Sequence, residues 1–272
     1  MCVLGCMLLS TVAMAAVPAP KPKKPTAKAA QVSARMRGWH TPTPNKAPPL
    51  DDDGRPKLAL YSLNTNDRVE MAAQSDHGGF SARDLDRAAH VLRDSRNGCE
   101  HPMDPRLLDL AYRIQTNFHA QEIRIVSAYR APRRHRKSNH GLGRALDMIV
   151  PGATDEEVAK FARELGFVGI GVYPSSGFVH VDVRSRSYFW VDRSGPGRRN
   201  RERGILGDLA SRSDSQAVTR GEHPTPAFAP LGDVDAWLRT RSSHAAAPAP
   251  PDEDDDEEGM ENGNGTPDGA EF

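Results

Sequence analysis

Apolar residues recur with the period of helices or strands only in the middle of this chain of 272 residues, between about Leu58 and Asp192. On either side the chain is rich in proline, alanine and lysine or in acidic residues, and no apolar period is present. Such segments bury too little apolar surface to offset the entropy lost on ordering. The sequence therefore predicts one small folded domain over residues 58–194, flanked by disordered segments.

The residues before this domain divide into two parts. Residues 1–16 are apolar and then small, and Ala13-Met14-Ala15 resembles a site at which signal peptides are cleaved. The apolar run is shorter than a membrane-spanning helix needs. Residues 17–57 place lysines among prolines and alanines, which is typical of a linker. We therefore expect export to the periplasm or cell envelope, without stable membrane insertion once the signal peptide is removed.

Residues 195–272 end in acidic and glycine-rich sequence, and we expect most of this stretch to be disordered. Over the whole chain, 36 basic residues balance 36 acidic ones. This balance argues against a nucleic-acid partner. Cys99 is the one cysteine outside the first six residues, so a processed chain would contain no internal disulfide. We expect the processed chain to be a monomer.

Several local signals predict the elements of the domain. Ser81 and Asp104-Pro105 are helix starts, because Ser and Asp cap helices and Pro suits the first helical position. Thr154 opens a third helix with a capping box. Strands are predicted at 58–63, 69–72, 122–127, 145–150, 169–173 and 178–183. Helices come first and the later strands cluster, which favours an α+β fold with the N-terminal helices packed on an antiparallel sheet.

The last predicted strand carries polar residues on one face. Residues two apart in a strand point the same way. Its valines at 179, 181 and 183 therefore form the core face, while His180 and Asp182 point to the other side.

Asp147 lies inside an otherwise apolar strand, where an unpaired carboxylate is costly, so a metal or a cationic partner is implied. His140 precedes it across Gly141 and Gly143, which allow the two side chains to converge, although an ordinary turn would use the same glycines. Two imidazoles and one carboxylate are a common ligand set for catalytic zinc, with a fourth position left for water. From spacing alone, a zinc site and separate local partners for each residue both remain open.

The pattern Ser138-x-His140-x-x-Gly143-x-Ala145-x-Asp147, followed by His180-x-Asp182, resembles the zinc signature of the M15 peptidases. That group includes D-Ala-D-Ala peptidases and shares its fold with the Hedgehog signalling domain. Within it, the chain is most similar to the murein endopeptidase K subgroup. The similar segments are 58–64, 111–115, 126–130 and 169–174, and the resemblance covers about residues 58–190.

The resemblance implies roles for individual residues. His140, Asp147 and His180 match the Zn²⁺ ligands of the family. Arg130 matches an arginine beside the site, where a guanidinium can hold a peptide carboxylate or stabilise a developing oxyanion. The alternative for Arg130 is a structural ion pair with a nearby acid.

Two tyrosines from the matching segments, Tyr129 and Tyr173, are expected beside Arg130 as substrate-binding residues. The resemblance also implies a substrate: the peptide cross-links of peptidoglycan, hydrolysed by a zinc endopeptidase. Two other functions remain open, a D-Ala carboxypeptidase that trims stem peptides and a domain that binds peptidoglycan without cleaving it.

The sequence departs from the family pattern at the catalytic acid or base. Many members carry an acid three residues before the last ligand, or a histidine two residues before it, whereas this chain has Gly177 and Phe178. Asp182 is the remaining acid on the correct strand face. It either activates the attacking water as a catalytic residue or orients a ligand histidine. Residues 131–134 also lack the asparagine that is usual in the subgroup.

Overall fold

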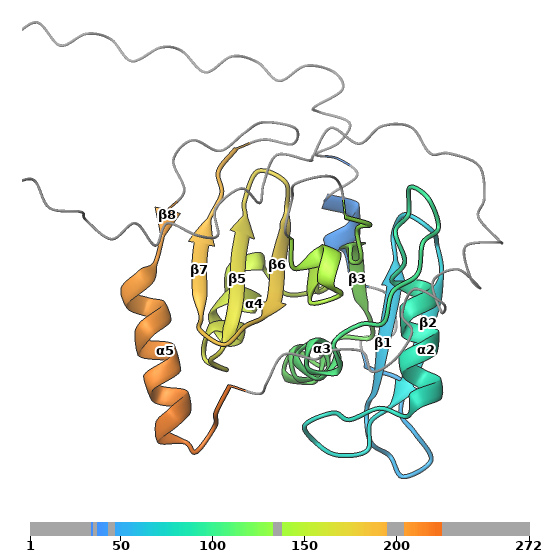
Figure 1. Cartoon of the computed structure of the whole chain (residues 1–272). Helices are drawn as coiled ribbons and strands as arrows, with labels where there is room; N and C mark the ends of the chain where they lie inside the picture. Colours follow the sequence, from blue (N-terminus) through green and yellow to red (C-terminus); the bar gives the residue numbers. More distant parts are fainter. Residues whose placement is uncertain (1–33, 35–36, 43–46, 133–137, 195–203, 225–272) are drawn as a thin grey trace, which may run out of the picture.

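The computed structural model describes residues 34, 37–42, 47–132, 138–194 and 204–224. These residues form one domain built on an eight-stranded sheet in the order β2-β1-β3-β4-β6-β5-β7-β8 (Figure 1). The strands are β1 (Lys57–Ser62), β2 (Arg68–Ala72), β3 (Ile123–Ser127), β4 (Ala145–Ile149), β5 (Val168–Tyr173), β6 (Phe178–Val183), β7 (Tyr188–Val191) and β8 (Gly204–Ile205). The helices are α2 (Ala82–Val91), α3 (Pro105–Asn117), the 3-10 turn η1 (His140–Leu142), α4 (Asp155–Arg163) and α5 (Gly207–Thr219).

Capping residues fix where the predicted helices start. The Ser81 side chain accepts a hydrogen bond from Asp84 N before α2. Asp104 caps α3, with Pro105 as its first residue. Thr154 and Glu157 form the capping box of α4. The predicted α+β class is confirmed.

The sheet is mixed, so the expectation of an antiparallel sheet is wrong in this respect. β1 pairs with β3 in parallel, and β5 pairs with β7 in parallel, while the other neighbours are antiparallel. The parallel pair β1–β3 becomes possible because β2, α2 and α3 lie between these strands in the chain and provide the crossover. Local alternation predicts that a strand exists but carries no information on its direction.

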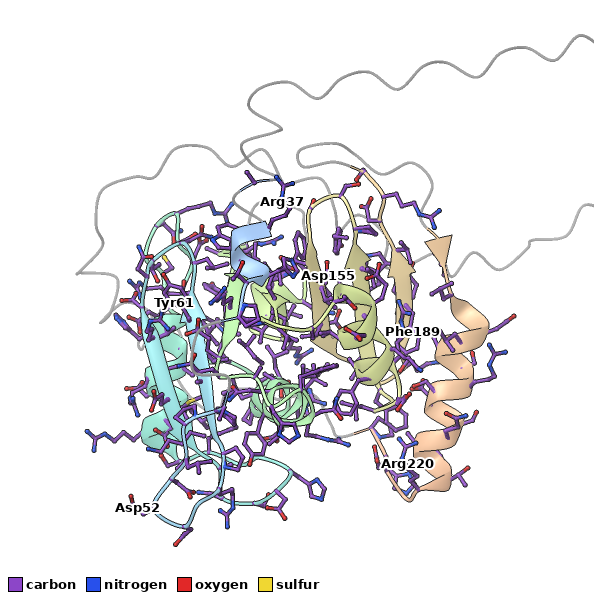
Figure 2. The ribbon with its side chains drawn as sticks, turned by 180° about the vertical axis from the view of Figure 1, so that it is seen from behind. Arg37, Asp52, Tyr61, Asp155, Phe189 and Arg220 are labelled. Carbon is purple, nitrogen blue, oxygen red and sulfur yellow. The ribbon has the colours of Figure 1, made fainter. Side chains whose placement is uncertain are left out.

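The two faces of the sheet differ in chemistry. One face is apolar and contributes side chains such as Val179, Val181 and Phe189 to a single buried cluster with residues of the helices. Figure 2 shows this side, with α4 in front of the strands, α5 along the edge beside β7, and Phe189 labelled near both helices. The opposite face of β4 and β6 carries Asp147, His180 and Asp182, with Asp147 paired with His180 and Ala145 paired with Asp182. The helices therefore anchor one face, and the polar residues gather on the other.

α5 and β8 lie within the stretch 195–272, which we expected from the sequence to be mostly disordered. Residues 204–224 form these two elements within that stretch. The helix contacts the domain through small residues and polar contacts, which give little apolar periodicity: Ala210, Ser213 and Ala217 are buried. Asp214 accepts hydrogen bonds from Phe167 N and from Ser187 N, each at 2.8 Å. The rest of the tail lies outside the described residues.

Part of the expected linker also contacts the domain. Arg124 Nη1 donates to the carbonyl oxygens of Trp39 at 2.6 Å and Thr41 at 3.0 Å, and Gly152 N donates to His40 O at 3.3 Å. Residues 37–42 of the expected linker therefore contact the domain, and its last residue, Lys57, begins β1. The expected signal peptide, residues 1–16, lies outside the described residues. Among the helices of the described chain, none has the length and apolar character to cross a membrane.

The contact between α5 and the turn after α4 can be tested at Gly166. This residue has φ +74°, and a Cβ there would lie 2.4 Å from Ala217 Cβ. Gly166→Ala combines a left-handed backbone cost with overpacking, so we expect the free energy of unfolding to fall by about 3 kcal/mol. Urea denaturation measures this change.

Gly221→Ala is the matched control, because Gly221 also has a positive φ, +84°, but a Cβ added there would meet no atom of the described residues within 4 Å. Only the backbone cost applies there, about 1 kcal/mol. Equal losses in the two variants would mean that α5 does not pack on Gly166 in solution.

Candidate metal centre

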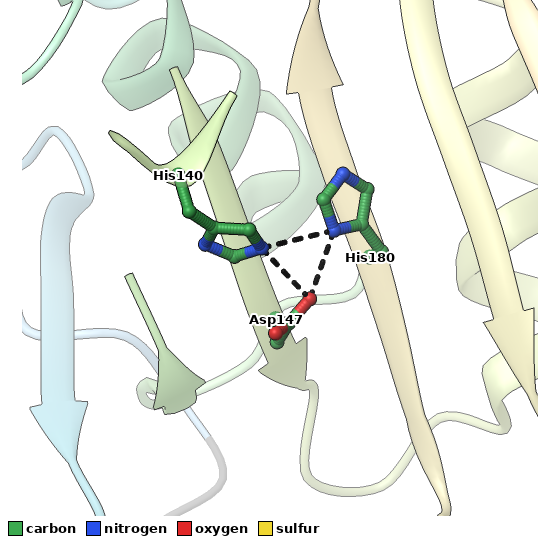
Figure 3. A group of neighbouring side chains, drawn as sticks. All are labelled: His140, Asp147 and His180. Atoms are coloured by element: carbon green, nitrogen blue, oxygen red, sulfur yellow. Dashed lines mark hydrogen bonds and ion pairs between the residues drawn. The ribbon is translucent and has the colours of Figure 1, made fainter. Parts of the chain in front are cut away.

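Strand register brings two of the three expected ligands together. β4 and β6 are antiparallel neighbours, with Asp147 opposite His180. Both side chains therefore leave the same face of the sheet next to each other. The third expected ligand, His140, comes from η1, which precedes β4 (Figure 3). Gly143 ends η1 with φ +65°, and a Cβ there would lie 2.5 Å from Pro102 O. The turn that returns the chain from His140 to β4 thus requires glycine.

Three atoms converge at the centre of this group. His140 Nε2 lies 3.3 Å from His180 Nδ1 and 3.4 Å from Asp147 Oδ1, and His180 Nδ1 lies 2.9 Å from Asp147 Oδ1. All three residues are buried. A tetrahedral shell with bonds of about 2.0–2.1 Å places its ligand atoms about 3.3 Å apart. The two nitrogens and one oxygen therefore have the chemistry and the separations of a site that can bind a metal ion.

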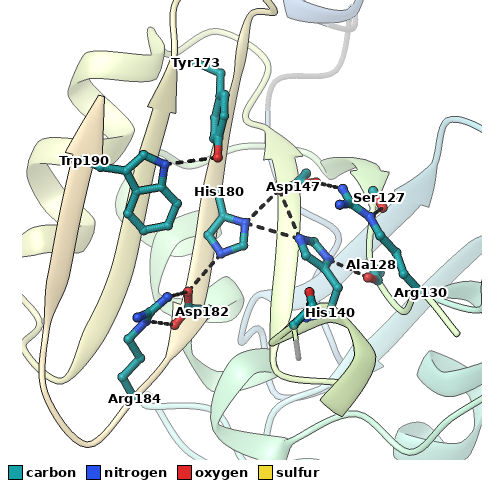
Figure 4. Close-up of polar contacts among 11 residues, drawn as sticks. Ser127, Ala128, Arg130, His140, Asp147, Tyr173, His180, Asp182, Arg184 and Trp190 are labelled. Carbon is teal, nitrogen blue, oxygen red and sulfur yellow. Dashed lines mark hydrogen bonds and ion pairs between the residues drawn. The ribbon is translucent and has the colours of Figure 1, made fainter. Parts of the chain in front are cut away.

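The outward-facing atoms of two ligands are fixed by neighbours from β3 and the residues after it. His140 Nδ1 donates to Ala128 O at 2.6 Å, so Nε2 is the ring nitrogen that points to the centre. Arg130 Nη2 donates to Asp147 Oδ2, while Arg130 Nε donates to Ser127 Oγ at 2.8 Å (Figure 4). Asp147 therefore presents Oδ1 to the centre and Oδ2 to a guanidinium.

His180 is fixed in the same way from the other side. Its Nε2 donates to Asp182 Oδ2 at 2.9 Å, so Nδ1 faces the centre. Asp182 has no exposed surface, and Arg184 donates to both of its oxygens, from Nε to Oδ1 at 2.5 Å and from Nη2 to Oδ2 at 2.8 Å. The structure places Asp182 behind the imidazole ring of His180, away from the three converging atoms (Figure 4).

Electrostatics show that the centre favours positive charge. Burial opposes ionisation of Asp147, yet His140 and Arg130 hold its pKa well below the usual range. Burial also opposes protonation of His180, but hydrogen bonds to Asp147 and Asp182 raise its pKa to about 10. Burial likewise opposes ionisation of Asp182, while His180 and Arg184 lower its pKa. With two ionised carboxylates around the imidazole, a cation in the centre is stabilised.

The two predicted substrate tyrosines are both buried and border this group. Tyr129 stacks on His101, with ring centroids 4.8 Å apart, and burial raises its pKa to about 12. Tyr173 Oη accepts a hydrogen bond from Trp190 Nε1 at 3.0 Å. Whether substrate reaches either ring stays a prediction. The structure thus gathers His140, Asp147, His180, Asp182 and Arg130 into one cluster.

Sequence reasoning missed Arg184 and Trp190. The ring of Trp190 lies 5.2 Å from that of His180, and its position depends on Gly171, whose Cβ would lie 2.4 Å from the indole. The spacing Gly169-x-Gly171 in β5 was a usable signal, because residues two apart face one side and both glycines oppose the polar residues of β6.

Comparison with known proteins identifies the family of this chain. Residues 52–188 match the M15 peptidase family described as peptidoglycan L,D-endopeptidase MepK. The probable peptidoglycan L,D-endopeptidase MepK of Haemophilus influenzae is 32% identical over 154 residues, covering 52% of this chain and 82% of that protein. MepK of Escherichia coli K12 is 30% identical over 142 residues, covering 47% of this chain and 78% of that protein, and MepK of Shigella flexneri gives the same values.

No solved structure matches the chain. The family match nevertheless covers half of the chain and includes the three converging residues, the arginine beside them and Asp182. The resemblance seen in the sequence motifs is therefore confirmed, and this chain belongs to the MepK family of M15 peptidases.

Proposed function

We propose that this protein is a zinc-dependent L,D-endopeptidase that hydrolyses peptide cross-links of peptidoglycan. The observation that carries the proposal is the convergence of His140 Nε2, Asp147 Oδ1 and His180 Nδ1 at separations of 2.9–3.4 Å. The family match supports the substrate, since the relatives are named peptidoglycan L,D-endopeptidases. A cell-wall substrate agrees with the expected export to the periplasm or cell envelope.

Zinc is the metal that suits these donors best. Two imidazole nitrogens and one carboxylate oxygen at tetrahedral separations are a common catalytic zinc set, with the fourth position open. When bound, the ion would supply Lewis acidity for the attack of water on the scissile amide. Other residues of the site would orient the ligand side chains, place a positive charge beside them and keep solvent out of the buried cluster.

Arg130 is proposed to act on both the ligand and the substrate. Its side chain is 31% exposed, although it also holds the buried Asp147. Its positive charge therefore lies at the boundary between the buried cluster and the solvent. A guanidinium in that place can orient a peptide carboxylate or stabilise negative charge on the carbonyl oxygen during attack.

Asp182 is proposed to orient His180 rather than to activate water. Both of its oxygens are engaged by Arg184, and Oδ2 also accepts the His180 Nε2 proton. A carboxylate that accepts from the outer nitrogen of a ligand histidine fixes its tautomer and ring orientation. Because the ring of His180 lies between Asp182 and the central atoms, this arrangement favours the orienting role.

A non-catalytic peptidoglycan-binding function has one observation in its favour. Gly177, where many relatives of the wider group carry an acid, is a turn residue with φ +72°. Phe178, the next position, is apolar. A test of the function therefore has to measure wall binding as well as cleavage.

The first prediction concerns a metal ligand. His140→Ala removes one of the three donors, so cleavage of purified wall sacculi in the presence of Zn²⁺ should fall below about one hundredth of the wild-type rate. Released muropeptides are separated by chromatography and identified by mass. His77→Ala, in an exposed loop, is the control and should retain wild-type activity.

The products distinguish the alternatives. Loss of cross-linked dimers in the wild type alone supports an endopeptidase, whereas release of D-Ala without loss of dimers supports a carboxypeptidase. Sacculi that bind the wild type but yield no products would support the binding function instead. Unchanged hydrolysis by His140→Ala would exclude this metal site.

The second prediction separates the two roles of Asp182. If Asp182 orients His180, Asp182→Asn should weaken Zn²⁺ binding by about 10–100-fold, and hydrolysis at limiting Zn²⁺ should fall with it. Competition with a chromophoric chelator measures the affinity. If Asp182 were the general base, the variant would bind Zn²⁺ as the wild type does and would lose activity even at saturating Zn²⁺.

A further inference from the structure

Arg184 and Asp182 form a two-point contact directly behind His180. The guanidinium donates from Nε to Oδ1 at 2.5 Å and from Nη2 to Oδ2 at 2.8 Å (Figure 4). The Asp182 side chain is fully buried, and that of Arg184 is 19% exposed. Paired N–H donors in a fixed plane set the orientation of a carboxylate as well as its position. Arg184 therefore determines where the Asp182 oxygens point.

One of these oxygens is shared between the guanidinium and the imidazole. Asp182 Oδ2 accepts from Arg184 Nη2 at 2.8 Å and from His180 Nε2 at 2.9 Å. Without the two-point contact, the carboxylate would be free to rotate and would be a buried charge with one remaining partner. The orientation of the His180 ring thus depends on Arg184 through Asp182.

The neighbouring strand β5 leaves space for the ion pair between Arg184 and Asp182. Gly169 of β5 pairs with Asp182 of β6 and with Tyr188 of β7. A Cβ on Gly169 would lie 2.2 Å from Asp182 Oδ2 and 2.5 Å from Arg184 Nε. Any side chain at this position would displace the ion pair, so the glycine allows the carboxylate and the guanidinium to lie flat against β5.

Aromatic rings of β7 hold the guanidinium from the side. Arg184 Cζ lies 5.3 Å from the ring centroid of Tyr188 and 5.9 Å from that of Trp190. Trp190 also packs beside the ring of His180. A cation within about 6 Å of aromatic faces is attracted to them, which restricts the rotamers that Arg184 can adopt. The same indole therefore contacts both ends of the series Arg184, Asp182 and His180.

We infer that Arg184 is a positioning residue of the metal centre: it holds Asp182 so that His180 keeps its Nε2 proton outward and presents Nδ1 to the ion. This inference rests on the proposed zinc function. The guanidinium of Arg184 donates to both oxygens of Asp182, and Asp182 in turn accepts from His180 Nε2. Its effect passes through Asp182 and is seen in metal affinity and in the tautomer of His180.

Arg184→Lys tests this role, because lysine keeps the charge but cannot form the two-point contact or stack in the same way. Asp104 and Arg106 provide the matched control. They have the same spacing of two residues, Asp104 is fully buried, and Arg106 Nε donates to Asp104 Oδ1 at 2.9 Å. No contact between Asp104 and a ligand histidine is present in the described part of the chain. Asp104 N donates to Gly143 O at 2.8 Å, so this pair lies beside the end of η1, but its carboxylate does not stand behind a ligand histidine as Asp182 does. Arg106→Lys therefore reproduces the loss of an equivalent ion pair without changing the carboxylate that holds His180.

Two quantities are measured on the chain without the expected signal peptide, residues 1–16, for the wild type and both variants. Zn²⁺ affinity is obtained by competition with a chromophoric chelator, and the His180 tautomer by long-range ¹H–¹⁵N spectra of the imidazole nitrogens. We expect Arg184→Lys to bind Zn²⁺ about 10–100-fold more weakly, with altered His180 nitrogen shifts. Arg106→Lys should bind Zn²⁺ with an affinity within about threefold of the wild type. This should hold even if its thermal unfolding midpoint falls by as much as that of Arg184→Lys.

The outcomes separate this inference from the function on which it rests. If the wild type binds Zn²⁺ and cleaves sacculi while Arg184→Lys matches it in affinity and in His180 shifts, the role of Arg184 is wrong and the function stands. An equal loss of affinity in both lysine variants would show a general effect of stability and would also overturn the role. If the wild type binds no divalent ion, both the proposed function and the inference are wrong.

Discussion

The pairing of Asp147 with His180 across β4 and β6 is the constraint on which the rest of the site depends. A slip of one residue in this register would turn His180 toward the core and bring a valine to the polar face. The apolar face prevents such a slip, because Val179 and Val181 are buried in the cluster formed with the helices. Helices α2, α3, α4 and α5 thus stabilise the candidate metal centre from the apolar face, whereas η1 supplies His140. The packing of the valines on the apolar face therefore determines which residues of β6 lie on the polar face.

Charge balance is the second constraint, because all of the central groups are buried. Arg130 contacts Asp147, Asp147 contacts His180, His180 contacts Asp182, and Asp182 contacts Arg184. The two arginines compensate the two carboxylates, and each arginine is the partly exposed member of its pair. Breaking a buried pair by removing one partner leaves an uncompensated charge, which typically costs about 3–5 kcal/mol. Arg130 and Arg184, at the two ends of this series, are therefore needed for the stability of the fold as well as for the geometry of the site.

The sequence predicted the parts of the fold that depend on contacts between residues close together in the chain. The caps at Ser81, Asp104 and Thr154 and the alternation in β6 are set by neighbours in sequence, and the structure contains them. Glycine spacing and strand alternation made His140, Asp147 and His180 candidates, and the resemblance to the M15 signature implied their role as ligands. Strand direction, the docking of residues 37–42 and the position of α5 depend instead on contacts between distant segments. α5 in particular packs through small residues, which leave little apolar signal. Arg184 was missed because its importance comes from a contact with Asp182 and from space left by a glycine on another strand.

At Gly177 the backbone conformation of the turn favours glycine, whereas many peptidases of the wider group carry an acid at this position. Its N–H donates to Tyr173 O at 2.7 Å and its φ is +72°, so it closes the hairpin that joins β5 to β6. An L-amino acid in that conformation costs roughly 1–2 kcal/mol. The carbonyl of Gly177 also accepts from His40 Nε2 at 2.9 Å, which ties the hairpin to the segment before the domain. In this chain the turn position therefore serves the geometry that holds His180 in register. A carboxylate placed there would strain the same hairpin that presents the ligand, which is a physical reason for Gly177 to occupy it.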